Sequence, residues 1–287
     1  MGVLRTQRKV GENDIMRKVR VISIVLLVFL SSIMIFPFFW LIRGSFMTDF
    51  EIMSLPIRWL PSRFSLDNFF NALAAAPFGR YFFNSVLLSS VNSIGAMLSA
   101  SFIAFGFARL KFPGRDIWFA LMLSTLMIPF AVVMIPQFIG WNALNLNNTF
   151  APLMIPAFFG HAFNVFLMRQ FYFGIPKEYD EAALVDGANY FTIYWKIVLP
   201  MAKPALVAVG VFTFISTWND FLPQLLYLQS PSLRTISLGL QVFIGQFTAS
   251  QNLLMAASTL SVLPMIIVFF VAQRYFIEGI TFAGIKG

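Results

Sequence analysis

Six long apolar runs restrict the fold of this sequence more than any other feature. A bilayer core about 30 Å thick is crossed by roughly 20 apolar residues in helical conformation. The runs are continuous and do not alternate between polar and apolar residues, which favours helices over a membrane β-barrel. We therefore expect an all-α integral membrane protein with six transmembrane helices. The runs cover Val21–Ile42, Ser85–Ala108, Ile117–Ile139, Pro152–Met168, Pro204–Tyr227 and Leu253–Ala272.

The charge content supports this fold class. Only 11% of the 287 residues are charged, whereas a soluble domain carries roughly a quarter. The net charge of +8 would suggest nucleic-acid binding in a soluble protein. No basic patch interleaved with exposed aromatics is found, however, and Lys and Arg of membrane proteins collect in cytoplasmic loops. We expect a lipid membrane and no nucleic acid around this chain.

The basic residues also predict the topology. Six spans leave both chain ends on one side, and fifteen of the twenty Lys and Arg residues fall there if the N-terminus is cytoplasmic. This arrangement, N-in and C-in, divides the chain into a basic cytoplasmic N-terminus (1–20), a membrane domain (21–276) and a cytoplasmic tail (277–287). The first run is too long for a signal-peptide core and no A-x-A-like cleavage site follows it. We expect it to be a retained transmembrane helix.

Motifs of enzyme chemistry are absent from the sequence. There is no G-x-x-x-x-G-K-[ST] phosphate loop and no G-x-G-x-x-G after a strand. The lack of Cys excludes a disulfide framework, Cys-ligated zinc and thiol catalysis. The single histidine, His161, lies in the fourth run and is more simply explained by a helix–helix hydrogen bond than by a metal site. We expect no catalytic residue, no metal and no cofactor in this chain.

A few polar residues lie within the apolar runs. Such residues are costly in hydrocarbon and usually face a bundle interior or water. For Asp220 two interpretations stay open: an interfacial carboxylate beside Trp218 in an aromatic belt, or the polar rim of a translocation path. The candidate path residues are Asn92, Gln137, Asn164, Asn219 and Asp220.

An acidic segment, Glu178–Val207, interrupts the apolar pattern between the fourth and fifth runs. Its acids stand in the first turns of a helix, where the helix dipole favours them, and Gly187 allows that helix to stop or turn. A second short amphipathic helix, "YFTIYWKIVLP", follows it. Membrane-surface helices usually carry Lys and Arg on the polar face. Four carboxylates within nine residues instead favour a protein partner with a basic surface, bound on the cytoplasmic side.

The segment "EAALVDGANYFTIYWKIVLP" resembles the EAA signature of permease subunits of ABC importers, E-A-A-x-x-x-G followed after nine residues by I-x-L-P. The ending "QRYFIEGITFAGIKG" and the stretches "GWNALNLNNTFAPLMIP" and "TWNDFLPQLLYL" are similar to carbohydrate-uptake permeases of the maltose-transporter type. The resemblance implies a cytoplasmic coupling helix pair over 174–203, between the fourth and fifth spans. Its coupling positions here are Glu181, Ala182, Ala183, Asp186, Gly187, Ile197, Leu199 and Pro200.

The resemblance also implies partners and a place in the cell. The family's permeases pair with a second permease, either a homologous chain or a second copy. Two ATP-binding subunits receive the EAA loops. The glutamate of the motif, here Glu181, pairs with an arginine of the ATP-binding subunit. ATP and Mg are bound by those subunits. An extracytoplasmic binding protein delivers the solute, and the chain spans a bacterial or archaeal cytoplasmic membrane.

Several functions remain open from the sequence. The expected one is half of the translocation path for a sugar or oligosaccharide, without enzyme activity in this chain. The EAA loop is shared with importers of amino acids and phosphate, so another small solute is the first alternative. A stand-alone secondary transporter is disfavoured because inverted repeats and a chain of membrane carboxylates are absent. A non-transporting scaffold would leave the polar residues of the spans unexplained.

Overall fold

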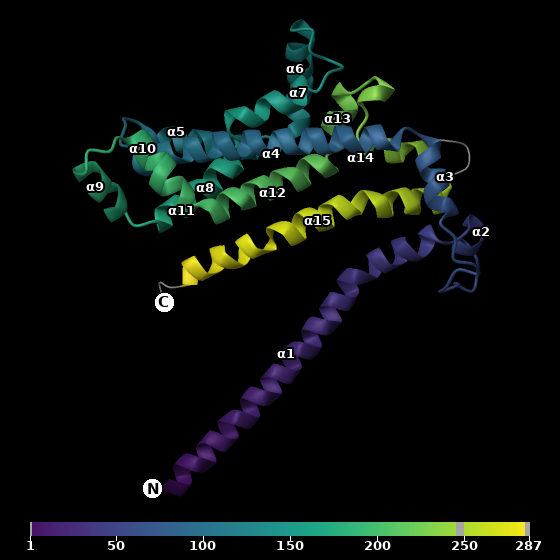
Figure 1. Cartoon of the computed structure of the whole chain (residues 1–287), viewed down its shortest axis with the longest axis horizontal. Coiled ribbons are helices and arrows are strands. Elements are labelled where there is room, and N and C mark those ends of the chain that lie inside the picture. The colour runs from purple at the N-terminus through teal and green to yellow at the C-terminus, as the bar shows by residue number, and fades with distance from the viewer. Residues whose placement is uncertain (1, 245–249, 285–287) are drawn as a thin grey trace. The chain divides into compact units, whose positions relative to one another are not determined.

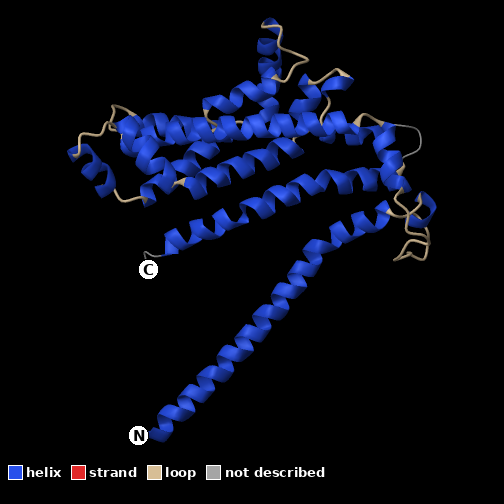
Figure 2. Cartoon of the chain, viewed as in Figure 1, coloured by secondary structure: helices blue, strands red, loops and turns tan. Residues whose placement is uncertain are grey.

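The chain is helical throughout the part that the structure describes. The computed structural model describes residues 2–244 and 250–284, with side chains from residue 16 to residue 275 except Lys18 and the 245–249 gap. Within these ranges every regular element is a helix (Figure 2). Of the expected cytoplasmic tail, residues 277–284 continue the last helix, and residues 285–287 lie outside the described part.

Four helical segments are long and apolar enough to cross a bilayer as single spans. They are Val19–Ser45, Phe78–Arg109, Ala151–Gly174 and Gln251–Tyr275, and they contain the first, second, fourth and sixth expected spans. The helices concerned, all labelled in Figure 1 except η2, are α1 (Gly2–Ser45), α4 (Phe78–Arg109), α7 (Ala151–Met154) with η2 (Ile155–Phe159) and α8 (Ala162–Gly174), and α15 (Gln251–Gly284).

The expected third span is not one continuous helix. It consists of α5 (Arg115–Ser124), the 3₁₀ turn η1 (Thr125–Met127) and α6 (Phe130–Ala143), with a bend of 99° at the break. Pro129 causes the break, because a proline disfavours helical conformation in the residue before it. Ile128 accordingly has extended backbone angles of −85° and 113°. The span expected over Ile117–Ile139 is therefore bent, and it is one span if the bent pair is counted as one.

The expected fifth span is also divided. Helix α12 (Lys203–Asn219) ends at Asp220, whose backbone is extended, and the short helix α13 (Leu222–Tyr227) follows. Pro223 explains the end of α12, since its ring would clash with the carbonyl four residues earlier. At its other end α12 meets the preceding helical segment at 76°. The span expected over Pro204–Tyr227 is therefore a helix, a break and a second helix. Counting each bent pair as one span gives up to six spans.

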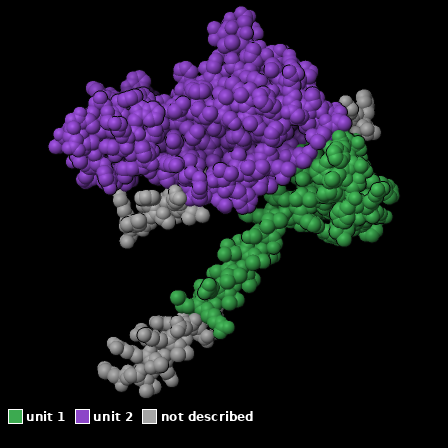
Figure 3. All heavy atoms as spheres, viewed as in Figure 1, with its two compact units in different colours: residues 1–72, 249–259 green, residues 73–248, 260–287 purple. Residues whose placement is uncertain are grey.

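The chain divides into two compact units, coloured separately in Figure 3. Unit 1 comprises residues 1–72 and 249–259 and includes the short helix α2 (Asp49–Ile52) and most of α3 (Asp67–Ala75). Asn252 holds this unit together: its backbone N–H donates to Asp49 Oδ1 at 2.9 Å, and its side chain donates to Asn68 Oδ1 at 3.1 Å.

A buried carboxylate caps α2 in unit 1. Glu51 accepts hydrogen bonds from the backbone N–H groups of Thr48 and Ser62, each at 2.9 Å. Thr48 in return caps the helix by accepting from the Glu51 backbone N–H, which makes a capping box. Hydrogen bonding to Ser62, then to Thr48, lowers the pKa of Glu51 to about 2.

Unit 2, residues 73–248 and 260–287, is built around α4. Three alanines at four-residue spacing on α4, Ala96, Ala100 and Ala104, are fully or almost fully buried in its core. Small residues of this kind let helix backbones approach closely. Helices α8 and α12 pack on this face of α4, and the Ser93 hydroxyl donates to the Gly210 carbonyl at 2.9 Å. Unit 2 also contains η4 (Pro231–Leu233), α14 (Ile236–Gly239), η5 (Leu240–Phe243) and the short helices between Gly174 and Lys203 that are described below.

Candidate functional site

The acidic segment folds as the expected pair of short helices. We name residues 175–202 the acidic loop; it contains α9 (Glu178–Val185), α10 (Tyr190–Ile193), the π-helical turn η3 (Tyr194–Val198) and α11 (Leu199–Met201). Gly187 stops α9 in a left-handed conformation with φ of +81°. The N–H groups of Gly187 and Ala188 donate to the carbonyls of Leu184 and Ala183, which is the Schellman pattern of a helix end.

Two neighbouring acids of α9 have opposite surroundings. Successive helical residues are turned by about 100°, so adjacent side chains diverge. Asp180 is buried, and its Oδ2 lies 3.0 Å from Nε of Arg109 at the end of α4. Glu181 is exposed. The sequence expectation gave a role to Glu181 and none to Asp180, because Arg109 lies 71 positions earlier and its side chain could not be placed.

Arg109 joins three segments. Its Nη2 donates to the carbonyl of Ile175, the residue that ends α8, at 2.8 Å, and its Nε faces Asp180 of α9. Only 2% of the Arg109 side chain and 11% of the Asp180 side chain are exposed. Burial raises the pKa of Asp180, and the positive charge of Arg109 opposes that rise. Removing one partner of a buried ion pair costs roughly 3–5 kcal/mol, because the other charge is left uncompensated.

The second half of the acidic loop is attached to α4 by hydroxyl groups. The hydroxyls of Ser101 and Tyr194 lie 2.8 Å apart in a hydrogen bond, and the Tyr172 hydroxyl donates to the Ser101 carbonyl at 3.2 Å. All three residues are buried. The acidic loop is thus fixed to α4 through Ser101 and through Arg109.

The expected coupling positions are divided between the surface and the core. Glu181, Ala182, Asp186, Gly187 and Pro200 are exposed, Ile197 and Leu199 are half-buried, and Ala183 is buried. Val185, between them in sequence, is 88% exposed. The exposed positions form a surface with an acidic group, small residues and an apolar side chain, which suits docking into a partner's groove.

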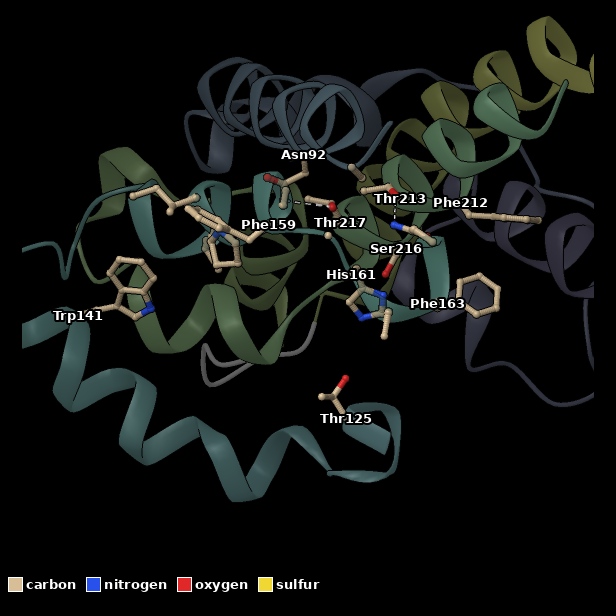
Figure 4. A pocket seen from close by; sticks show the side chains of 18 residues that line it. Asn92, Thr125, Trp141, Phe159, His161, Phe163, Phe212, Thr213, Ser216 and Thr217 are labelled. Carbon is tan, nitrogen blue, oxygen red and sulfur yellow. Dashed lines mark hydrogen bonds between the residues drawn. The ribbon is translucent and has the colours of Figure 1, made fainter. Parts of the chain in front are cut away.

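A cavity of about 1000 Å³ lies in unit 2 (Figure 4). Its polar side chains are neutral amides, hydroxyls and one imidazole, and its aromatic side chains come from several segments. No Asp, Glu, Lys or Arg is among the described residues of its wall. The labelled wall residues are Asn92, Thr125, Trp141, Phe159, His161, Phe163, Phe212, Thr213, Ser216 and Thr217.

Hydrogen bonds between helices organise one wall of the cavity. Asn92 of α4 donates to Thr217 Oγ1 of α12 at 3.3 Å, and Asn164 of α8 donates to Thr213 Oγ1 at 3.2 Å. Both amides are largely buried. The Oδ1 atom of Asn92 is buried and accepts no hydrogen bond from the described residues.

The structure brings together two of the five expected path residues. Asn92 and Asn164 line the cavity, whereas Gln137, Asn219 and Asp220 do not. Gln137 is exposed on α6, and Asn219 is exposed with its side chain donating to the Ile215 carbonyl at 2.9 Å. Asp220 is half-buried at the break after α12. The path role of these residues stays a prediction.

Several cavity residues were missed by sequence reasoning. His161 lies on the cavity wall, although the sequence suggested a helix–helix hydrogen bond for it. Thr213, Ser216 and Thr217 follow the helical spacing of three and four residues, which is a polar stripe that the sequence contains. Thr125 and Trp141 come from the two sides of the bend at Pro129, which no helical pattern could reveal. Within the described residues no three His, Cys, Asp or Glu side chains group as a metal site.

Comparison with known proteins identifies relatives along nearly the whole chain. The chain is 36% identical over 262 residues to the arabinooligosaccharides transport system permease protein AraQ of Halalkalibacterium halodurans, covering 90% of this chain and 94% of that protein. It is 32% identical over 261 residues to the diacetylchitobiose uptake system permease protein NgcG of Streptomyces coelicolor, covering 90% of this chain and 86% of that one.

A solved structure agrees with the fold, and a family model identifies the family. The structure resembles a chain of a bacterial ABC transporter involved in the import of the acidic polysaccharide alginate. The TM-score is 0.78 and the sequence identity is 23%, and the match covers 91% of this chain and 97% of that chain. Such permeases are multi-pass membrane proteins that act in transport with other subunits, and they are not enzymes. Residues 96–281 match the family model, and they include the acidic loop and all but one of the cavity residues named above. The chain therefore belongs to the binding-protein-dependent transport system inner membrane components.

Proposed function

We propose that this chain is the permease subunit of an ATP-driven importer and forms one half of the path for a sugar or oligosaccharide. The acidic loop is the observation that carries this proposal. It presents Glu181 outward on a helix that is fixed to the membrane core, which is what a docking element for a separate ATP-binding subunit requires. ATP and Mg²⁺ act in that subunit, and this chain holds neither.

The assembly follows from the proposed role. Two ATP-binding subunits dock on the cytoplasmic side, a second permease, either a homologous chain or a second copy, completes the path, and an extracytoplasmic binding protein delivers the solute. Six spans with both ends in the cytoplasm agree with the charge distribution. The membrane is a bacterial or archaeal cytoplasmic membrane.

A carbohydrate substrate is supported by the relatives and by the cavity. The relatives are named for the uptake of arabinooligosaccharides and of diacetylchitobiose. The cavity combines aromatic rings with neutral hydrogen-bonding groups, a combination that suits a polyhydroxylated ligand with apolar ring faces. The wall offers no charged group for the carboxylate of an amino acid or for a phosphate.

Reconstitution in liposomes tests the proposal. The chain is assembled with its partner permease, the ATP-binding subunit and the binding protein encoded beside it, and uptake is measured with a panel of labelled neutral oligosaccharides, an amino acid and phosphate. The proposal predicts that oligosaccharide uptake requires ATP on the side of the liposome membrane where the ATP-binding subunits are bound. Uptake of the amino acid or phosphate alone, or flux driven by an ion gradient without nucleotide, would contradict it.

A further inference from the structure

The ion pair between Arg109 and Asp180 serves the function proposed so far only as an anchor for α9. Neither residue lines the cavity, and Asp180 faces away from the surface that carries Glu181. A buried ion pair is weak support for stability in general, since apolar residues can often replace it without loss. Its position, at the joint between a surface helix and a membrane helix, is the feature to explain.

We propose that Arg109 and Asp180 are a positioning pair that locks α9 to the end of α4, so that a movement imposed on the acidic loop displaces the cavity wall. This inference rests on the proposed function, because it assumes that ATP-binding subunits move the loop. It adds the contact that transmits the movement from the loop, which is the ion pair, and the helix that transmits it to the cavity, which is α4.

The pair is the main attachment of α9. This helix has eight residues, and only Asp180 and Ala183 in it are buried. An isolated helix of this length is unstable in water, so it depends on contacts with the rest of the protein. An alanine methyl group contributes little to its orientation. The ion pair therefore determines where α9 lies relative to the membrane helices of unit 2.

Helix α4 provides a direct connection from the pair to the cavity. Arg109 is its last residue, and Asn92 and Ala96 on the same helix line the cavity. Arg109 and Asn92 are 17 positions apart, which corresponds to about 25 Å along an uninterrupted helix. The buried alanine face of α4 packs against α8 and α12, so the helix moves as a packed body and does not bend locally.

The covalent route from the loop to the cavity is less direct. Helix α12 also lines the cavity and follows the loop in sequence, but it meets the loop at a bend of 76°. The bend falls at Ala202, where the chain leaves helical geometry between α11 and α12. A joint of this kind can absorb a rotation of the loop, whereas an ion pair at the end of a straight helix transmits it.

The contacts of Arg109 specify an arginine. Its guanidinium reaches Asp180 of α9 with Nε and the carbonyl at the end of α8 with Nη2. A lysine ammonium lacks the planar fork that makes both contacts from one position. We expect Arg109→Lys to keep the charge and to lose part of the positioning.

The experiment uses the complete transporter in liposomes and measures the number of solute molecules taken up per ATP hydrolysed. For Asp180→Asn we expect ATP hydrolysis to continue and this ratio to fall about tenfold, and for Arg109→Lys we expect a smaller fall. Asp116→Asn is the matched control, because Asp116 is an exposed acid beside Arg115 and Arg169 outside the loop, and its ratio should stay that of the wild type. A wild-type ratio in Asp180→Asn would overturn the inference.

A distance measurement separates positioning from a general folding defect. The chain has no Cys, so spin labels can be placed at Glu178→Cys on α9 and Leu98→Cys on α4, both exposed positions. The inference predicts one narrow distance, the same in nucleotide-free and nucleotide-trapped complexes, and a broad distribution once Asp180→Asn is added. A narrow, unchanged distance in the Asp180→Asn background would overturn it.

The two failures are distinguishable. If the wild-type transporter takes up no sugar under ATP, the proposed function fails while the label distances still report on the pair. If the wild type transports sugar and Asp180→Asn keeps both the ratio and the distance, only the positioning role fails.

Discussion

The C-terminal end of α4 and its middle carry opposite kinds of contact. At the end, Arg109 and Asp180 form a buried ion pair with oppositely charged atoms 3.0 Å apart. In the middle, Asn92 takes part in a cavity wall made of neutral amides, hydroxyls and aromatic rings. One helix therefore joins a region of strong, fixed contacts to a region of weak, exchangeable ones.

This difference matches the tasks of the two regions in a transporter. A joint that transmits movement has to resist deformation, and an ion pair shielded from water resists it strongly. A binding cavity that releases its ligand in every cycle has to hold it weakly, and neutral hydrogen bonds contribute about 0.5–1.5 kcal/mol each. The predictions below test this division, from the largest expected effect to the smallest.

The largest effect is expected at the docking surface. In Glu181→Lys the exposed carboxylate becomes an ammonium that faces the basic surface expected on the ATP-binding subunit. Losing a charged contact at an interface costs about 2–5 kcal/mol, and we expect uptake to fall by roughly 30-fold or more. Uptake in liposomes and the amount of co-purified ATP-binding subunit measure it. Asp67→Lys changes an exposed acid of α3 and should leave both unchanged.

The second effect is expected at the turn of the acidic loop. A Cβ at Gly187 would meet no atom within 4 Å, so Gly187→Ala introduces backbone strain only, from its φ of +81°. The left-handed conformation costs a non-glycine residue about 1–2 kcal/mol. We expect uptake per ATP to fall about five- to thirtyfold if that energy distorts the loop.

Gly106→Ala provides the control for this strain. Gly106 also has open space around its Cβ position but lies within α4. The substitution should be neutral or slightly stabilising, because alanine favours helix over glycine. Equal effects of the two substitutions would show that the turn at Gly187 has no special role.

A substitution in the cavity wall should change the solute concentration at half-maximal uptake, and not the uptake per ATP. Asn164→Ala removes a hydrogen-bonding group from the wall, and we expect the solute concentration at half-maximal uptake to rise roughly three- to tenfold. Uptake per ATP at saturating solute should stay that of the wild type. Asn219→Ala is the comparison variant, since Asn219 lies outside the cavity and should be silent. If Asn219→Ala raised the half-maximal concentration and Asn164→Ala did not, the solute path would lie at the end of α12 and not in this cavity.

The smallest effect is expected at Glu51, a buried carboxylate held mainly by hydrogen bonds, whose Oε1 lies 3.9 Å from Nη1 of the exposed Arg58. Glu51 is held by hydrogen bonds from Ser62 and Thr48, and its pKa is about 2 in the folded protein against 4.5 as a reference. A lowered pKa stabilises the fold fully above the unfolded value, and this contribution is lost as the pH falls from about 4.5 toward 2. The difference in Tm between the wild type and Glu51→Gln should therefore shrink over that range. A difference that does not depend on pH would contradict the role of the ionised carboxylate.

The sequence predicts the helical fold and the helices of the acidic loop well, and the bends less well. Four of the six expected spans are single segments by length and composition, although the fourth is interrupted at Gly160 and His161 between η2 and α8. Pro129 and Pro223 mark the breaks in the other two, but Pro37 and Pro264 lie inside continuous helices. A proline alone therefore does not determine whether a membrane helix bends, since packing decides whether the freed backbone groups find partners.

The candidate site was predictable to the extent that its contacts are local. Gly187 as the end of α9 follows from its neighbours in sequence, and the structure confirms it. The polar stripe of Thr213, Ser216 and Thr217 could have been found from helical spacing. The partner of Asp180 could not, because Arg109 is distant in sequence and nothing local determines which of two adjacent acids turns inward.

The link between the acidic loop and the cavity can be tested directly with one thiol. Ser216 lines the cavity and is exposed, and the chain has no other thiol, so Ser216→Cys can be modified selectively by a membrane-impermeant reagent applied from the side of the binding protein. Our account predicts that ATP and the loaded binding protein change the modification rate in the otherwise wild-type complex, and that Asp180→Asn abolishes the change. A rate that is independent of ATP, or a change that persists in Asp180→Asn, would contradict it.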